Sequence, residues 1–206
     1  MANDKNSSDQ KQRDLSGFSA RQRVMAAALK LFVEQGYFNT NVPDLSRESQ
    51  CSVGSIYHNF KNKEEIAVSL YNEGLKAFRN ALDQSVNDAN GLEEMIKQVV
   101  KSLLEFSEVN LQLSKFMWLC RHDEFMTGVI KPPTIVGFDS LGRKLTRAIK
   151  QGIKDKQIKS QNAQIIWSVV FGLPLGYIRD WLAGYNKTKP SEISEELAEI
   201  CWKALS

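Results

Sequence analysis

The side chains best suited to chemistry lie close together, between Ser52 and Lys63. They offer hydroxyls, a phenol, an imidazole and two ammonium groups, and no Asp or Glu lies within this stretch. Hydroxyl and ammonium groups are good donors to phosphate oxygens. Catalysis fits poorly, because the chain has only two histidines and shows no paired carboxylates in an apolar setting and no Ser–His or Cys–His pattern. We therefore expect a binding protein and not an enzyme.

Two short helices around a tight turn must position these groups. Asn41 or Thr40 caps the first helix, and Ser52 caps the second. In the second helix Ile56 and Phe60 lie four residues apart and are expected to face inward. The other side of that helix is then free for a partner. This layout predicts a helix-turn-helix whose second helix lies in the major groove of DNA.

The rest of the chain is also expected to be helical, with about nine helices and no strand alternation. Ser19 caps a first helix that Gly36 ends, and Asn62 caps a long helix that continues to about Asp88. Residues 1–17 hold too little apolar surface to order themselves, and we expect a disordered arm there. The remaining apolar patterns predict helices from Gly91 onward and over residues 111–122, 134–157, 160–184 and 191–205.

The amino-acid composition excludes few classes of protein. The chain is 42% hydrophobic and 25% charged, and its net charge of +3, all of it supplied by residues 1–63, supports DNA binding only weakly. We expect a cytoplasmic protein, because the N-terminus lacks an apolar signal region and Pro174, Arg179 and Asp180 interrupt the most apolar stretch, residues 164–185. Three widely spaced cysteines predict neither a disulfide framework nor a metal site; they are small buried hydrophobes or, alternatively, redox sensors.

The run from Ala27 to Tyr37, then Thr40, Val42 and Asp44–Leu45, and then Ser52 to Glu65 together resemble the DNA-binding domain of the TetR (tetracycline-repressor) family. The Gly-Ser-Ile-Tyr-His-x-Phe-x-x-Lys-Glu core is the most specific part. The resemblance implies an all-α fold: a helix-turn-helix domain at 18–66, then an antiparallel helical domain at 67–206 for effector binding and dimerisation. We expect no cofactor, and no metal either, because the adjacent residues His122, Asp123 and Glu124 cannot converge on one ion without a turn.

The resemblance also implies roles for single residues. Thr40, Ser52, Ser55, Tyr57 and Lys63 correspond to family positions that contact phosphates. Gly54 lets the helix backbone approach DNA, and Val53, Ser55 and His58 are the candidate base readers. Alternatives remain for three of them: Thr40 could be only an N-cap, Tyr57 could be packing and His58 could be solvated.

Two positions depart from the family pattern. Many relatives carry Lys where this chain has Val53, and a valine can pack on a thymine methyl but cannot hydrogen-bond a guanine. Gln50 stands where the family usually has Gly. If the turn requires a left-handed residue, Gln50 carries strain of about 1 kcal/mol.

The second half is expected to provide dimerisation and control. The last two helices carry apolar stripes, and Gly172 and Gly176 would allow close helix approach beside Pro174, which should kink its helix. The predicted dimer interface consists of Ile165, Val169, Gly172, Gly176, Ile193, Leu197, Ile200 and Ala204. The predicted effector pocket consists of Phe78, Met95, Phe106, Phe116, Trp118, Phe138, Trp167, Phe171, Tyr177 and Trp181, although each of these could be plain core.

Taken together, these features predict a homodimeric transcriptional repressor. A small, largely apolar or aromatic effector would tilt the long helix and release the protein from a pseudo-palindromic DNA operator. The alternative is a DNA-binding dimer controlled by a protein partner or by concentration, without an effector.

Overall fold

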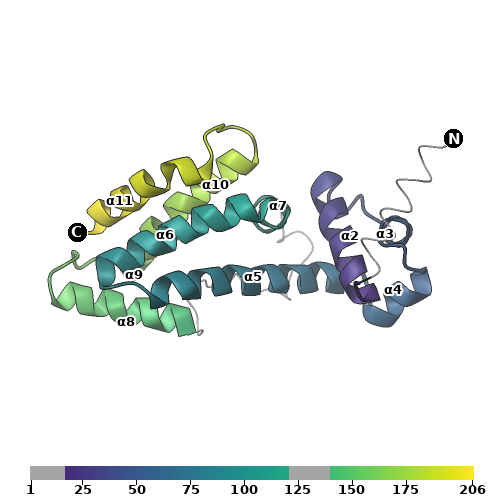
Figure 1. The fold of residues 1–206 in the computed structure, drawn as a ribbon, viewed down its shortest axis with the longest axis horizontal. Coiled ribbons are helices and arrows are strands. Elements are labelled where there is room, and N and C mark those ends of the chain that lie inside the picture. Colours follow the sequence, from purple (N-terminus) through teal and green to yellow (C-terminus); the bar gives the residue numbers. More distant parts are fainter. Residues whose placement is uncertain (1–16, 121–139) are drawn as a thin grey trace. The chain divides into compact units, whose positions relative to one another are not determined.

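A computed structural model describes residues 17–120 and 140–206, and over those residues the chain is helical with no strand (Figure 1). It divides into two compact units, residues 1–70 and 71–206. Helix α5 (Lys63–Asn87) begins in the first unit and continues into the second. The predicted arm at 1–17 lies outside the described residues except for Gly17.

The first unit packs three helices around a small apolar core: α2 (Ala20–Glu34), α3 (Val42–Ser49) and α4 (Val53–Asn59). Val24, Phe32 and Leu45 are at most 1% exposed. The fully buried pair Ile56 and Phe60 attaches α4 to this core, as its spacing predicts. The all-α expectation is confirmed for the described residues.

The helix starts follow local side-chain chemistry. Ser19 and Gln22 form a capping box at α2, and Asn41 and Asp44 form another at α3. At α4 the Ser52 hydroxyl accepts a hydrogen bond from the Ser55 backbone N–H. Asn41 is therefore the N-cap of α3, and the alternative that Thr40 caps it is wrong.

Gln50 takes the left-handed conformation at the end of α3, with φ 55° and ψ 33°. The strain expected from the sequence is therefore present in the turn between α3 and α4.

We predict that Gln50→Gly stabilises the first unit by about 0.5–1 kcal/mol, because glycine adopts positive φ without a Cβ penalty. Far-UV circular dichroism during urea unfolding measures this change in stability. Tryptophan fluorescence does not report on the first unit, because all four tryptophans lie in the second unit. The control Ala26→Gly, at an exposed position inside α2, should destabilise by about 1 kcal/mol; equal effects of the two changes would contradict the strain argument.

The second unit is built around α6 (Leu92–Val109), which packs against α7 (Leu111–Leu119), α8 (Ser140–Lys154) and α11 (Ser194–Leu205). In Figure 1 α10 and α11 lie alongside α6. The core between these helices holds Ile96, Leu103, Ile178 and Cys201, all fully buried. Short segments complete the unit, including the 3-10 turn Pro190–Ile193 before α11.

The stretch from Ala163 to Leu182 is one continuous helical run with a change of register. Its α9 (Ala163–Trp167) passes into a π-helical segment, Ser168–Gly172, and then into α10 (Leu173–Leu182). Pro174 lacks an N–H and cannot donate to the preceding turn, so the wider π turn lies where the sequence predicts a break. By length and composition alone this run could also cross a membrane, a test that core helices of soluble proteins pass too.

Candidate nucleic-acid interface

Helix α4 exposes most of the residues that the sequence predicts for DNA contacts, and Ser55, a predicted base reader, is partly exposed. Val53 is 42% exposed and Tyr57 is 53% exposed, and Gly54 and His58 are exposed as well. A Cβ added at Gly54 would meet nothing closer than the Ser52 hydroxyl at 4.0 Å, so the backbone there is open to an approaching partner. Because Ile56 and Phe60 take the buried side, α4 presents a coherent outer face without a carboxylate.

The two serines of α4 serve local structure as well. The Ser52 oxygen accepts from the Ser55 N–H at 3.1 Å, while the hydroxyl proton of Ser52 is still available to donate. The Ser55 carbonyl accepts from the Asn59 side chain at 2.8 Å. Ser52 can therefore cap the helix and donate to an anion at the same time.

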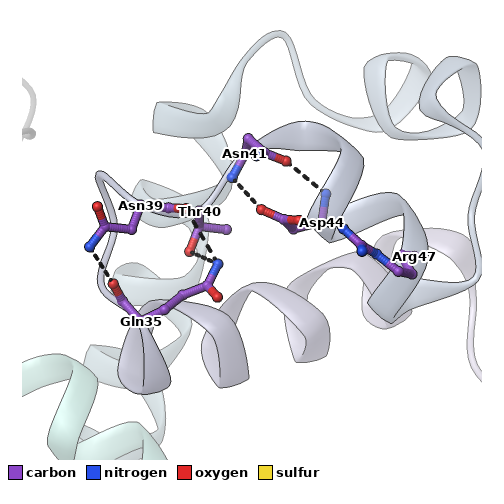
Figure 2. A network of polar contacts seen from close by, with 6 residues as sticks. All are labelled: Gln35, Asn39, Thr40, Asn41, Asp44 and Arg47. Atoms are coloured by element: carbon purple, nitrogen blue, oxygen red, sulfur yellow. Dashed lines mark hydrogen bonds and ion pairs between the residues drawn. The ribbon is translucent and has the colours of Figure 1, made fainter.

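Thr40 belongs to a closed polar network at the turn between α2 and α3 (Figure 2). Its hydroxyl donates to the Gly36 carbonyl at 2.8 Å and accepts from the Gln35 amide at 3.3 Å. The Asn39 amide donates back to the Gln35 carbonyl at 2.8 Å. Thr40 is only 1% exposed. Its predicted phosphate contact stays a prediction, and it would require this network to open.

Lys63 is also engaged inside the first unit. Its ammonium donates to the carbonyls of Tyr37, at 2.8 Å, and Thr40, at 2.7 Å. It lies 4.2 Å from the centroid of the Tyr37 ring, within cation–π range. Burial lowers the pKa of Lys63 from its ordinary value. The ammonium therefore ties the start of α5 to the α2–α3 turn, and one N–H remains for any other acceptor.

Two exposed cations near α4 are absent from the sequence-based site. Arg47 at the end of α3 has a side chain 76% exposed and pairs with Asp44 at 2.5 Å. Lys61 is exposed in the turn after α4. The first helix of a helix-turn-helix crosses the DNA backbone, where cations meet phosphates. Exposed cations at the helix ends are therefore the sequence signal that could have identified Arg47 and Lys61 as candidate phosphate contacts.

A second anchor holds α4 against α2. The Arg21 guanidinium lies 4.4 Å from the centroid of the Phe60 ring and donates to the Ser69 hydroxyl at 3.1 Å. Arg21 therefore connects α2, the end of α4 and the start of α5. Like Lys63, it is a cation engaged in contacts inside the first unit; the phosphate contact predicted for Lys63 stays a prediction, for which one N–H is left.

The predicted effector residues fall into separate groups in the second unit. Phe78 makes edge contacts with Phe106 and Trp118, at centroid distances of 5.3 and 5.8 Å. Trp167 stacks on Phe171 at 5.6 Å. Met95 and Phe116 are buried, Trp181 is half-buried and the Tyr177 hydroxyl donates to the Thr188 carbonyl. Phe138 lies outside the described residues.

Two buried polar atoms on α7 have no hydrogen-bond partner within the described part of the chain. They are the Ser114 hydroxyl and the indole N–H of Trp118. Ser114 is fully buried, and four residues separate the two positions, so both lie on one side of α7. Buried donors are normally satisfied, which makes this pair the best candidate for an acceptor atom of a ligand.

The cysteines are free, and two of them have raised thiol pKa values. Burial raises the pKa of Cys201 to about 11 and also raises that of Cys120. Since the thiolate is the reactive form, neither environment favours a redox sensor. Cys51 is buried in the first unit, as expected of a small apolar side chain.

Comparison with known proteins places this fold among bacterial regulators. Residues 24–70 match the family described as bacterial regulatory proteins, tetR family. The chain is 27% identical over 194 residues to the fatty acid metabolism regulator protein of Bacillus subtilis, a match that covers 86% of this chain and 91% of the relative.

Solved structures agree in fold. The transcriptional regulator FadR from Bacillus subtilis, in complex with stearoyl-CoA, aligns with a TM-score of 0.68 and 18% identity, over 90% of this chain and 99% of that one. AibR in complex with isovaleryl coenzyme A and operator DNA aligns with a TM-score of 0.68 and 16% identity, over 88% and 97%. At these identities the likeness demonstrates the fold alone.

Proposed function

We propose, from the premise that this chain belongs to the tetR family of bacterial regulatory proteins, that it is a homodimeric repressor released from its operator by an acyl-CoA effector. One observation carries the DNA-binding part: α4 buries Ile56 and Phe60 and turns Val53, Gly54, Tyr57 and His58 outward. The proposal describes a binding protein that acts in the cytoplasm and catalyses nothing.

The division of labour on α4 follows from side-chain chemistry. Ser52, Ser55 and Tyr57 carry hydroxyls that can donate to phosphate oxygens and set the register on DNA. His58 can hydrogen-bond a base edge, and Val53 can pack on a thymine methyl. A half-site with thymine opposite Val53 is therefore expected.

Dimerisation is supported by an apolar surface left uncovered in the single chain. Ile165 is 51% exposed, Leu173 47% and Ile200 48%, and Gly172, Gly176 and Ala204 are exposed as well. Isoleucine and leucine side chains gathered on neighbouring helices favour a second copy, because a two-fold interface buries the same patch on both protomers. Val169, Ile193 and Leu197 are half-buried at its margin.

The effector part rests on the second unit. Phe78, Phe106 and Trp118 provide apolar contact. The Ser114 hydroxyl and the Trp118 indole, which have no partner among residues 17–120 and 140–206, provide donors. An acyl-CoA combines an alkyl chain with a thioester carbonyl that could accept from them. Two regulators of similar fold are described in complex with stearoyl-CoA and isovaleryl coenzyme A.

Release requires that the effector bind the DNA-incompetent state more tightly than the DNA-bound state. A hundredfold loss of operator affinity needs about a hundredfold preference, since a ligand with equal affinity for both states shifts nothing. Helix α5 continues from the first unit into the second and is the element expected to tilt.

The test is selection of DNA from a random pool by the purified full-length chain, followed by titration with stearoyl-CoA and isovaleryl-CoA. We expect a pseudo-palindrome with half-sites about 34–36 Å apart, and release by one of the two thioesters. Failure to enrich any sequence would refute the DNA-binding proposal. Enrichment without release by either thioester would favour control by a protein partner or by concentration.

A further inference from the structure

Helix α8 carries a row of cations that the proposed DNA contacts do not use. Arg143, Arg147, Lys150 and Lys154 follow one another at spacings of four, three and four residues, and all four are exposed. At 3.6 residues per turn this spacing places them on one side of the helix, over about 16 Å of its length. We call these four residues the α8 cationic row.

The opposite side of α8 is firmly attached to the second unit. Leu141, Leu145 and Ile149 are buried, and Gly152 packs so closely on Leu92 that an added Cβ would clash with it. The Lys144 ammonium donates to the Val86 carbonyl at 3.0 Å and to the Asn87 side chain at 2.9 Å. The α8 cationic row is therefore held on a fixed helix and faces outward.

The charge on this segment is unusual for the chain. Residues 140–160 hold seven Lys or Arg and one Asp, a net charge of +6, whereas the whole chain carries +3. The single carboxylate, Asp155, accepts from the Gln151 amide at 2.9 Å. The net charge of the whole chain does not reveal this basic segment, because acidic residues elsewhere in the second unit offset its positive charge.

Four other lysines of the second unit, Lys97, Lys101, Lys189 and Lys203, are paired with acids. Lys97 contacts Glu199 and Lys101 contacts Glu195, each at 2.5 Å between α6 and α11. In the described part of the chain, by contrast, no carboxylate pairs with Arg147, Lys150 or Lys154. Like charges spaced three or four residues apart on a helix destabilise it. Arg147, Lys150 and Lys154 therefore repel one another without a compensating carboxylate among the described residues, and an anion bound across them would offset that repulsion.

We propose that the α8 cationic row binds the phosphate groups of the coenzyme A portion of the effector. This inference rests on the proposed function, because that function supplies the acyl-CoA. The aromatic cluster of the same unit suits the acyl chain, but its side chains carry no cation for the phosphate groups. Arginine forms paired hydrogen bonds with phosphate and lysine supplies a point charge, so the row suits several phosphates in series.

Helix α8 is attached to α5, the helix that also carries Phe78 of the aromatic cluster. Lys144 fixes α8 to the end of α5 at Val86, and Phe78 lies eight residues earlier on α5. Eight residues correspond to about 12 Å of helix. The proposal requires a ligand whose apolar end reaches Phe78 and whose phosphorylated end reaches the outward side of α8.

The test compares two variants of equal charge. One is R147Q/K150Q/K154Q in the α8 cationic row; the control is K76Q/K159Q/K187Q, at exposed lysines of the same unit. Stearoyl-CoA, isovaleryl-CoA, coenzyme A and stearate are titrated calorimetrically at several salt concentrations, and operator affinity is measured in parallel. The row variant should bind the coenzyme A compounds about tenfold more weakly, with a flatter salt dependence. Stearate and operator affinities should be unchanged, and the control should resemble the parent.

Equal affinity of parent and row variant for coenzyme A and its thioesters would overturn the inference. So would weakened operator binding with unchanged coenzyme A binding, which would assign the row to DNA. If coenzyme A binding depends on the row but neither thioester releases the operator, the inference stands and the proposed effector fails. If the parent binds none of the coenzyme A compounds, both fail.

Discussion

The double variant G172L/G176L is expected to be monomeric and to bind the operator about a thousandfold more weakly than the parent. Both glycines are exposed on the uncovered apolar face of the run Ala163–Leu182. Leucines there would separate two closely approaching helices at the proposed interface. A monomer engages one half-site only, and its affinity falls toward the non-specific level, which is typically at least about a thousandfold weaker.

The same change should leave the single chain folded. A Cβ added at Gly176 meets nothing within 4 Å, and one at Gly172 meets only the Ser168 Cβ, at 3.8 Å. Glycine in a helix interior is also about 1 kcal/mol less favourable than a good helix former. Sedimentation measures the mass and circular dichroism the fold. Ala77→Leu, which enlarges an exposed residue of α5, is the control and should remain dimeric. A persisting G172L/G176L dimer would place the interface elsewhere.

Lys63→Met is expected to weaken operator binding about thirtyfold while leaving its salt dependence unchanged. Methionine keeps an apolar stem beside the Tyr37 ring but removes both hydrogen bonds to the carbonyls of Tyr37 and Thr40. Two such bonds from a charged donor to partly buried carbonyls contribute about 2 kcal/mol in all, which corresponds to about thirtyfold. The arrangement of α3 and α4 that binds DNA then becomes a minor population.

The salt dependence separates positioning from phosphate contact. A lysine that neutralises a phosphate contributes about 0.9 to the slope of log affinity against log salt concentration. The matched control Lys61→Met removes an exposed charge two residues away and should leave the stability of the first unit unchanged. If Lys63→Met lowers the slope by about one without destabilising the unit, its ammonium contacts phosphate and the positioning role is wrong.

Local signals made the first unit largely predictable. The caps at Ser19, Asn41 and Ser52 and the inward pair Ile56 and Phe60 are consequences of residues three or four positions apart, which a sequence displays directly. The left-handed turn at Gln50 follows from the same local pattern. At Pro174 the break in regular hydrogen bonding was predictable, whereas its resolution as a π-helical segment depends on the packing of both flanking helices.

Long-range contacts were not predictable in this way. Lys63 donates to carbonyls 23 and 26 residues earlier in the chain. Thr40 is instead engaged locally, by partners four and five residues away. The sequence places a lysine and a threonine at family DNA-contact positions, and their phosphate contacts stay predictions, but it does not reveal the internal hydrogen bonds that both side chains also make. The α8 cationic row was also not apparent from the net charge of +3, because that number does not show where positive charges gather.

The sequence by itself determined the all-helical fold, the helix-turn-helix and the outward face of α4, because spacing and capping act within one or two helical turns. Only the tertiary structure decided which polar groups are free to meet a partner. Whether a cation is available depends on the carbonyls, rings and carboxylates that folding brings to it, and these come from distant parts of the chain. Lys63 and Arg21 are engaged inside the first unit for this reason, while Arg147, Lys150 and Lys154 face outward without an acidic partner among the described residues.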